Sequence, residues 1–320
     1  MKILKYFFAV LFVAALSFGC AGCTEKQGEG TGNEGGEQVQ EPGRATDLLT
    51  LFYQISEKQN KVNPREKIYI VAHRANTLEA MMNLVPENSL EIIKMAIESG
   101  VVDMIEIDVR PTKDGELVLM HDASINRTTT GGNKNVSSIT YEELMKYDMK
   151  RDTKVWTGMK VPTLKEAFEL CKGKMFINLD ISGKNVPIGK LANLIIECGM
   201  IDQVMIYSGQ SELVEYPTID PNFILHPYVS NVGAALGYRE YFGAVLFQYG
   251  LDYDKKTNIT FPAQMRAEGY LTYTNILNHD SKLRNGDYNP LLTFIESETD
   301  FIQTDVAELV HEFLDVEGLR

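Results

Sequence analysis

Short apolar runs rich in β-branched and aromatic residues recur from residue 68 to the end of the chain. Stretches with apolar residues at helical spacing lie between most of these runs. Strands that alternate with helices are typical of a parallel sheet with crossover helices. We count nine candidate strands: Ile68–Ala72, Met104–Val109, Leu117–Met120, Met175–Leu179, Val204–Tyr207, Phe223–Leu225, Ala244–Phe247, Tyr270–Tyr273 and Phe301–Ile302.

Two of the intervening helices have recognisable starts. Ser89 precedes a stretch whose apolar residues lie on one helical face, and Thr163 is followed three residues later by Glu166, as in a capping box. The apolar spacing predicts further helices over residues 189–198, 262–268 and 307–314.

About eight strand–helix units in one chain predict a closed (β/α)8 TIM barrel. Because nine strands are counted, one of them is expected to be misread or to belong to a side hairpin. An open doubly wound sheet is the alternative, but no G-x-G-x-x-G motif follows the first strand. The polar segment 122–160, after the third candidate strand, predicts a small insertion over the barrel mouth.

The start of the chain has the pattern of an export signal. A short positive region precedes the apolar run Phe7–Gly19, which is too short to span a bilayer comfortably. Small residues before a cysteine resemble the lipobox of bacterial lipoproteins, and Cys23 fits that pattern better than Cys20. We therefore expect a lipoprotein-type signal peptide and lipobox over residues 1–23, with a plain cleaved signal as the alternative.

Residues 24–45 are rich in Gly and Glu and hold almost nothing apolar, which predicts a flexible linker. The folded domain is then expected over residues 46–320. A lipid anchor followed by a linker predicts an exported lipoprotein, held at a membrane on the periplasmic or cell-surface side.

Composition and charge narrow the possible partners. The chain has 44% hydrophobic and 23% charged residues, and its 31 Lys and Arg against 44 Asp and Glu give a net charge of −13. No basic cluster relieves this deficit, which argues against a nucleic-acid partner. An anionic substrate would need a local cation, either a metal ion or a well-placed Arg or Lys. The two cysteines of the body, Cys171 and Cys198, are expected to be buried small apolar side chains.

Ionisable residues follow four consecutive candidate strands, where barrel enzymes hold their sites. Glu106 and Asp108 alternate with apolar residues on the second strand, so both carboxylates point the same way. Like charges side by side favour a bound cation, and oxygen ligands suit Ca²⁺ or Mg²⁺. Asp180, after the fourth candidate strand, could complete the set. A pair of surface carboxylates on an edge strand is the alternative, but a barrel has no edge strands.

Two histidines, His73 and His121, each follow an apolar strand directly. Their position at neighbouring strand ends, beside paired carboxylates, favours an acid–base role over a structural one. The adjacent Arg74 is a natural local cation for a phosphate or carboxylate group. The other histidines have no such neighbours and are expected to be structural or on the surface: His226, His279 and His311.

The motifs of the expected folded domain resemble, in order and spacing, those of the glycerophosphodiester phosphodiesterase family. The resemblance covers roughly residues 68–315. The motifs that carry it are Ala72-His73-Arg74-Ala75, Pro86-Glu87-Asn88-Ser89, Glu106-Ile107-Asp108-Val109, Thr112-Lys113-Asp114-Gly115, Met120-His121-Asp122, Arg127-Thr128-Thr129, Pro162-Thr163-Leu164 and Ile302-Gln303-Thr304-Asp305.

The resemblance implies a TIM-barrel hydrolase that converts glycerophosphodiesters to glycerol 3-phosphate and an alcohol. It implies that His73 and His121 are the general acid and base, without saying which is which. It further implies that Arg74 contacts the phosphate and that Glu87 lines and orients the site. A divalent cation and Arg74 would stabilise the charge that develops on the phosphate.

The resemblance also implies a divalent cation, Ca²⁺ or Mg²⁺, held by Glu106, Asp108 and Asp180. The family usually has Glu at the third position, with a substrate-binding Lys two residues later; here the Lys is displaced to Lys184. Two other interpretations of the function remain open. One is a phospholipase of the C or D type that acts on an intact lipid, and the other is a catalytically inactive, lipid-anchored binding protein.

Overall fold

The computed structural model describes residues 47–61 and 67–320. The expected signal peptide, its Cys20 or Cys23 and the linker over 24–45 lie outside the described residues and stay predictions. In the described part of the chain, every helix is too short or too polar to cross a membrane.

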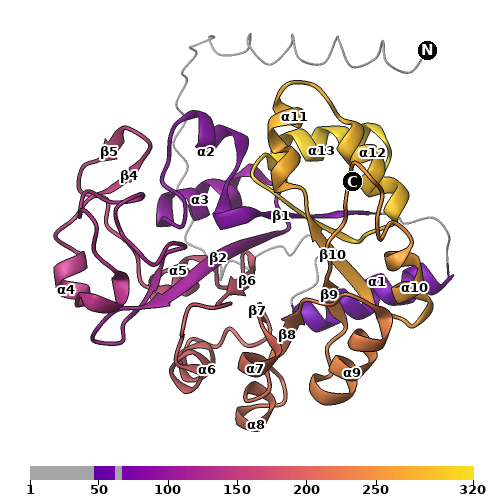
Figure 1. Cartoon of the computed structure of the whole chain (residues 1–320), viewed down its shortest axis with the longest axis horizontal. Coiled ribbons are helices and arrows are strands. Elements are labelled where there is room, and N and C mark those ends of the chain that lie inside the picture. Colours follow the sequence, from indigo (N-terminus) through magenta and orange to yellow (C-terminus); the bar gives the residue numbers. More distant parts are fainter. Residues whose placement is uncertain (1–46, 62–66) are drawn as a thin grey trace, which may run out of the picture. The chain divides into compact units, whose positions relative to one another are not determined.

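The centre of the fold is a ring of parallel strands (Figure 1). Their hydrogen-bonded order is β8-β7-β6-β2-β1-β11-β10-β9, and a parallel bridge between Tyr228 and Gln248 joins the two ends, with Val229 N–H donating to Gln248 O at 2.8 Å. This arrangement confirms the predicted TIM barrel. The strands are β1 (Tyr69–Ala72), β2 (Met104–Pro111), β6 (Phe176–Asp180), β7 (Val204–Ser208), β8 (Ile224–Pro227), β9 (Leu246–Gln248), β10 (Leu271–Asn275) and β11 (Phe301–Thr304).

The third candidate strand of the sequence is not a barrel strand. Strand β3 (Leu117–Leu119) runs antiparallel to β2, with Leu119 opposite Val109. The connection over residues 112–116 is a tight turn, whereas a parallel neighbour needs a crossover of a dozen or more residues. Asp180 therefore ends the third barrel strand, not the fourth.

The polar segment after β3 folds as an insertion with its own small core. It contains η3 (Val136–Ser138), the short helix α4 (Tyr141–Leu144) and an antiparallel hairpin, β4 (Met149–Arg151) and β5 (Lys154–Trp156). Its core packs under the end of β3 and consists of Val118, Met120, Ile125, Val136, Ile139, Leu144, Met149 and Val161.

Helices cover the outside of the barrel (Figure 1). Ser89 Oγ accepts the Ile92 N–H at the start of α3, and Thr163 and Glu166 form the expected capping box at the start of α5. The helical elements are η2 (His73–Ala75), α2 (Leu78–Met82), α3 (Leu90–Ser99), α5 (Leu164–Cys171), α6 (Ile188–Glu197), α7 (Gln210–Leu213), α8 (Tyr216–Ile219), α9 (Val232–Phe242), α10 (Phe261–Ala267), η4 (Leu277–His279), α11 (Asp280–Arg284), α12 (Asn289–Ser297) and α13 (Ala307–Val316).

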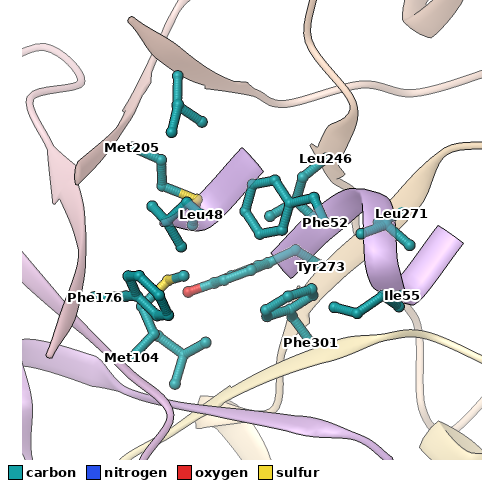
Figure 2. Packing of buried hydrophobic residues seen from close by; sticks show 12 residues of the cluster. Leu48, Phe52, Ile55, Met104, Phe176, Met205, Leu246, Leu271, Tyr273 and Phe301 are labelled. Carbon is teal, nitrogen blue, oxygen red and sulfur yellow. The ribbon is translucent and has the colours of Figure 1, made fainter. Parts of the chain in front are cut away.

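Helix α1 (Leu48–Lys61), which the strand pattern does not predict, closes the N-terminal end of the barrel. Leu48, Phe52 and Ile55 pack against interior side chains from the first residues of the strands (Figure 2). The barrel side of this cluster is Val71, Met104, Phe176, Met205, Ile224, Leu246, Leu271, Tyr273 and Phe301. Because one end of the barrel is filled with apolar side chains, polar chemistry is confined to the opposite end.

Cys171 is buried and free, as expected, and burial raises the pKa of its thiol to about 12. Cys198 is also free but only half-buried, so the expectation of burial was wrong for this residue. It follows the last residue of α6, and the helix face that enters the core is formed by Leu191, Ala192 and Ile195 instead.

Candidate active site

Three carboxylates meet at the C-terminal end of the barrel. Glu106 and Asp108 come from β2, and Asp180 comes from β6, where it lies directly beside Asp108 in the strand register. One oxygen of each residue lies within 4.8 Å of the others. Burial, and then the negative charges of Asp108 and Asp180, raise the pKa of Glu106 to about 8.

This set of residues fits a hard divalent cation. All three donors are carboxylate oxygens, Glu106 and Asp108 are buried, and one oxygen of each residue lies within 4.8 Å of the others. Ca²⁺ and Mg²⁺ prefer oxygen ligands of this kind. The predicted metal ligands are therefore brought together, on two adjacent strands, in an arrangement that could hold an ion.

Lys184 is the local cation of this carboxylate cluster. Its Nζ lies 2.7 Å from Asp180 Oδ1 and 3.0 Å from Asp108 Oδ1, and its side chain is only 4% exposed. The backbone reverses directly after β6, with Gly183 at φ 63°, which turns Lys184 back over the strand end. Burial opposes ionisation of Asp108, but the neighbouring Lys184 charge leads the interactions that hold the pKa of Asp108 below its usual range.

His73 lies directly after β1 in the short helix η2 and contacts a carboxylate on each side. Its Nδ1 is 2.8 Å from Asp305 Oδ1, and its Nε2 is 4.0 Å from Glu106 Oε2. Burial by itself would lower the pKa of His73, but the hydrogen bond to Asp305 and the charge of Glu106 outweigh it and raise the pKa. Asp305 follows β11, the strand next to β1 in the barrel.

His121 has a similar arrangement on the other side of the site. Its Nδ1 lies 2.7 Å from Asp122 Oδ1, and Arg127 Nε donates to Asp122 Oδ2 at 2.7 Å. The hydrogen bond from Arg127 leads the interactions that hold the pKa of Asp122 well below its usual range. Asp122 is therefore a carboxylate that accepts hydrogen bonds from both neighbours.

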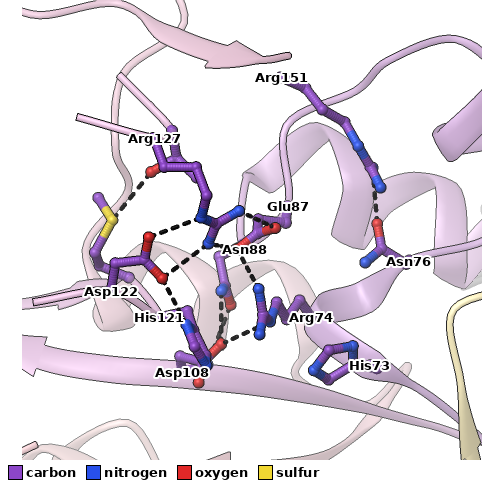
Figure 3. Close-up of polar contacts among 12 residues, drawn as sticks. His73, Arg74, Asn76, Glu87, Asn88, Asp108, His121, Asp122, Arg127 and Arg151 are labelled. Atoms are coloured by element: carbon purple, nitrogen blue, oxygen red, sulfur yellow. Dashed lines mark hydrogen bonds and ion pairs between the residues drawn. The ribbon is translucent and has the colours of Figure 1, made fainter. Parts of the chain in front are cut away.

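Arg74 and Glu87 connect the two sides (Figure 3). Arg74 Nη1 donates to Glu87 Oε1 at 2.8 Å, and Arg127 donates to both oxygens of the same carboxylate at 2.8 and 2.6 Å. Burial opposes the ionisation of Glu87, but the two guanidinium groups hold its pKa below the usual range. Arg74 Nε is buried without a hydrogen-bond partner, and it lies 3.6 Å from Asp108 Oδ2. A buried N–H of this kind is suited to an anion that enters the site.

Asn88 holds the central carboxylate in place. Its Nδ2 donates to Asp108 Oδ2 at 2.9 Å, and its Oδ1 accepts the Asp108 N–H at 3.1 Å. Figure 3 shows Arg74 between His73 and His121, with the Asp108 side chain overlapping that of His121 in this view. The site thus has two histidines, each bound to its own carboxylate, around an anionic centre beside an Arg74 N–H that is ion-paired with Asp108 but makes no hydrogen bond.

The remaining histidines lie away from this centre or lack its partners. His226 is fully buried in the barrel, where burial lowers its pKa to about 3 and keeps it neutral. Its Nδ1 is 3.4 Å from Asn178 Oδ1, within a buried polar layer that also contains Tyr273 and Gln303. His279 lies in η4, and His311 lies on α13 outside the barrel.

Several polar residues of the site were not predicted as site residues. Asp305, Asp122, Arg127 and Asn88 lie inside the motifs noted above, so their place in those motifs was a weak signal of a role in the site. Their contacts join segments up to 232 residues apart, as between His73 and Asp305. Spacing along the chain carries no information about such contacts.

Fold and site together define a TIM-barrel protein with an acidic, histidine-containing centre at its C-terminal end. Residues 73–193 match the family model described as the Glycerophosphoryl diester phosphodiesterase family. Over these residues the chain is similar to this family. The match includes both histidines, the carboxylate cluster and Lys184.

Among curated proteins, the chain is similar to the glycerophosphodiester phosphodiesterase of Caldanaerobacter subterraneus subsp. tengcongensis. The two are 42% identical over 118 residues, which cover 36% of this chain and 45% of that relative. The matched part of the chain thus spans less than half the length of this relative.

Two solved structures show the same fold. A glycerophosphoryl diester phosphodiesterase from Parabacteroides distasonis aligns with a TM-score of 0.70 and 24% identity, over 83% of this chain and 92% of that one. A phosphodiesterase from Oleispira antarctica, solved in complex with the product sn-glycerol-3-phosphate, aligns with a TM-score of 0.58 and 22% identity, over 77% and 96% of the two chains.

Proposed function

We propose that this protein hydrolyses glycerophosphodiesters to glycerol 3-phosphate and an alcohol, with the help of one divalent cation, Ca²⁺ or Mg²⁺. The observation that supports this most directly is the placement of two carboxylate-bound histidines at an anionic centre, beside a buried Arg74 N–H that makes no hydrogen bond (Figure 3). The match of residues 73–193 to the glycerophosphoryl diester phosphodiesterase family model supports the same reaction class.

The hydrogen bonds of the histidines define which ring nitrogen is available for chemistry. Interactions with neighbouring groups lower the pKa values of Asp305 and Asp122, so both are acceptors at neutral pH. Each histidine must then donate from Nδ1, which leaves Nε2 as the atom that takes or gives a proton. The geometry supports His73 and His121 as the pair that performs acid–base work.

The reaction that we propose has two steps, each with two proton transfers. In the first, the neighbouring glycerol hydroxyl attacks phosphorus, expels the alcohol and leaves a cyclic phosphate; in the second, water opens this ring to glycerol 3-phosphate. In each step one histidine takes the proton of the attacking O–H as the new P–O bond forms. The other gives a proton to the alkoxide as the old P–O bond breaks. Arg74 and Lys184 are the cations that face the phosphate, and Glu87 holds Arg74 in position. A bound divalent ion on Glu106, Asp108 and Asp180 would stabilise the charge that develops on phosphate oxygens.

Release of glycerol 3-phosphate tests this proposal directly. The substrates would be glycerophosphocholine, -ethanolamine, -glycerol and -inositol, each with Ca²⁺, with Mg²⁺ and with chelator. We expect metal-dependent release from at least one of them, and loss of release in Glu106→Gln. Release only from a lysophospholipid or an intact phospholipid would instead support a phospholipase. No release and no bound metal would support an inactive binding protein.

Asp305→Asn tests the proposed orientation of His73. An amide would let His73 take the other tautomer, so we expect kcat to fall by about 10²–10⁴-fold with little change in KM. Steady-state kinetics would measure both parameters, with the exposed Asp315→Asn as a matched control. Equal kinetics in the two variants would contradict the orientation that we propose.

Lys184→Met tests whether the buried ammonium and a metal ion share carboxylates. The Lys184 ammonium lies against one oxygen of Asp108 and one of Asp180, two of the three carboxylates that would hold the metal ion. The ammonium and a bound metal ion would therefore repel each other. We expect Lys184→Met to bind Ca²⁺ about tenfold more tightly in calorimetric titrations. Lys190→Met, which removes an exposed charge outside the cluster, should bind it like the wild type. A weaker affinity in Lys184→Met would show that the ammonium supports the ion.

A further inference from the structure

The hairpin of the insertion is linked through one residue, Asn76, to the carboxylate that binds His73. Arg151, the last residue of β4, donates from Nη1 to Asn76 Oδ1 at 2.8 Å and to the Val85 carbonyl at 2.8 Å. Asn76 in turn donates from Nδ2 to Asp305 Oδ1 at 2.9 Å, and this same oxygen is 2.8 Å from His73 Nδ1. Figure 3 shows the Arg151 side chain extending toward Asn76, with His73 nearby.

The chemistry of these side chains allows only one orientation of the Asn76 amide. A guanidinium group has donors alone, so it must face the amide oxygen of Asn76. The ionised Asp305 has acceptors alone, so it must face the amide nitrogen. Arg151 therefore turns the donor side of Asn76 toward Asp305. Asn76 is 3% exposed, which leaves little access for a water molecule to replace either partner.

Other contacts fix the hairpin on the same loop. Trp156 Nε1 donates to the Leu84 carbonyl at 2.7 Å, and Lys154 Nζ donates to the Asn83 carbonyl at 2.8 Å. The Lys154 ammonium also lies over the Trp156 ring, 4.1 Å from its centroid. These contacts hold β4 and β5 against the segment after α2, so the Arg151 side chain starts from a fixed position.

We infer that Arg151 is a positioning residue for His73, acting through Asn76 and Asp305. The insertion thereby contributes to the orientation of a histidine that belongs to the barrel, although its residues are far from His73 in the sequence. This inference rests on the proposed function, in which His73 transfers a proton.

A double-mutant cycle separates this role from a general effect on the hairpin. We expect Arg151→Met to lower kcat about tenfold or more with KM changed less than about twofold, because small displacements of a catalytic group are costly. In the Asp305→Asn background, the same substitution should change kcat by less than about twofold, since its path to His73 is already broken. Lys134→Met is the matched control, because it removes an ion pair with Glu143 inside the insertion and no contact of the hairpin with the loop after α2.

The outcomes distinguish the inference from the proposed function. Equal losses from Arg151→Met in both backgrounds, or an equal loss in Lys134→Met, would overturn the positioning role while leaving the hydrolysis intact. An inactive wild type, across all substrates and both metals, would overturn the proposed function and the inference with it. If Arg151→Met fails to fold, Arg151→Lys takes its place in the same cycle, and its loss of kcat must also disappear in the Asp305→Asn background.

Discussion

Replacing His73 with alanine is expected to lower kcat for glycerophosphodiester hydrolysis by about a thousandfold. The substitution removes the ring nitrogen that transfers a proton in the proposed mechanism, and it leaves Asp305 without the imidazole that it binds. His73 lies in the single turn η2 at the barrel mouth, outside the apolar core, so the fold should remain. Steady-state release of glycerol 3-phosphate would measure the loss, and circular dichroism would check the fold.

The matched control is His311→Ala. His311 lies on α13 outside the barrel, so its removal should leave kcat within about twofold of the wild type. Turnover of the His73 variant at near wild-type rates would remove this residue from the mechanism. In that case His121 and Asp122 would be the remaining acid–base pair of the site.

The second large effect is expected on stability rather than activity. Phe301 is fully buried where helix α1 meets the barrel (Figure 2), and its ring contacts three others. The ring centroids lie 5.7 Å from Phe52, 5.0 Å from Tyr69 and 6.4 Å from Tyr273. Phe301→Ala should therefore lower the free energy of unfolding by about 3–5 kcal/mol, through lost burial and a remaining cavity.

Urea unfolding would measure this change, with Tyr241→Ala as the control. Tyr241 is 74% exposed, and its removal should change the free energy of unfolding by about 0.5 kcal/mol or less. A loss below about 1 kcal/mol in Phe301→Ala would mean that helix α1 can repack into the space. It would also mean that the apolar end of the barrel is less rigid than its contacts suggest.

Much of the fold could be predicted because the apolar pattern repeats. Eight of the nine candidate strands are barrel strands, and Ser89 and Thr163 cap helices as expected. The exception is β3, whose apolar run resembles that of a barrel strand. A short connection makes it antiparallel, and pattern alone does not distinguish the two pairings. Helix α1 was not predicted, because only its packing against the N-terminal end of the barrel explains where its apolar residues lie.

The candidate site was predicted in its parts but not in its connections. Glu106 and Asp108 share a face because strands have a period of two, and this follows from the sequence. The distance of Asp180 from them depends on the pairing of β2 with β6. Lys184 was expected to bind substrate, and the structure adds that its ammonium lies on Asp108 and Asp180.

The sequence by itself determined the barrel, the residue types of its mouth and the family resemblance, because periodicity and motif spacing are local properties. Tertiary structure alone decided which carboxylate binds each histidine and how the insertion reaches Asn76. Those contacts join β1 to β11 and the hairpin to the loop after η2, which lie far apart along the chain. Closure of the barrel brings these segments together, and the local pattern does not say which strands and loops become neighbours when the ring closes.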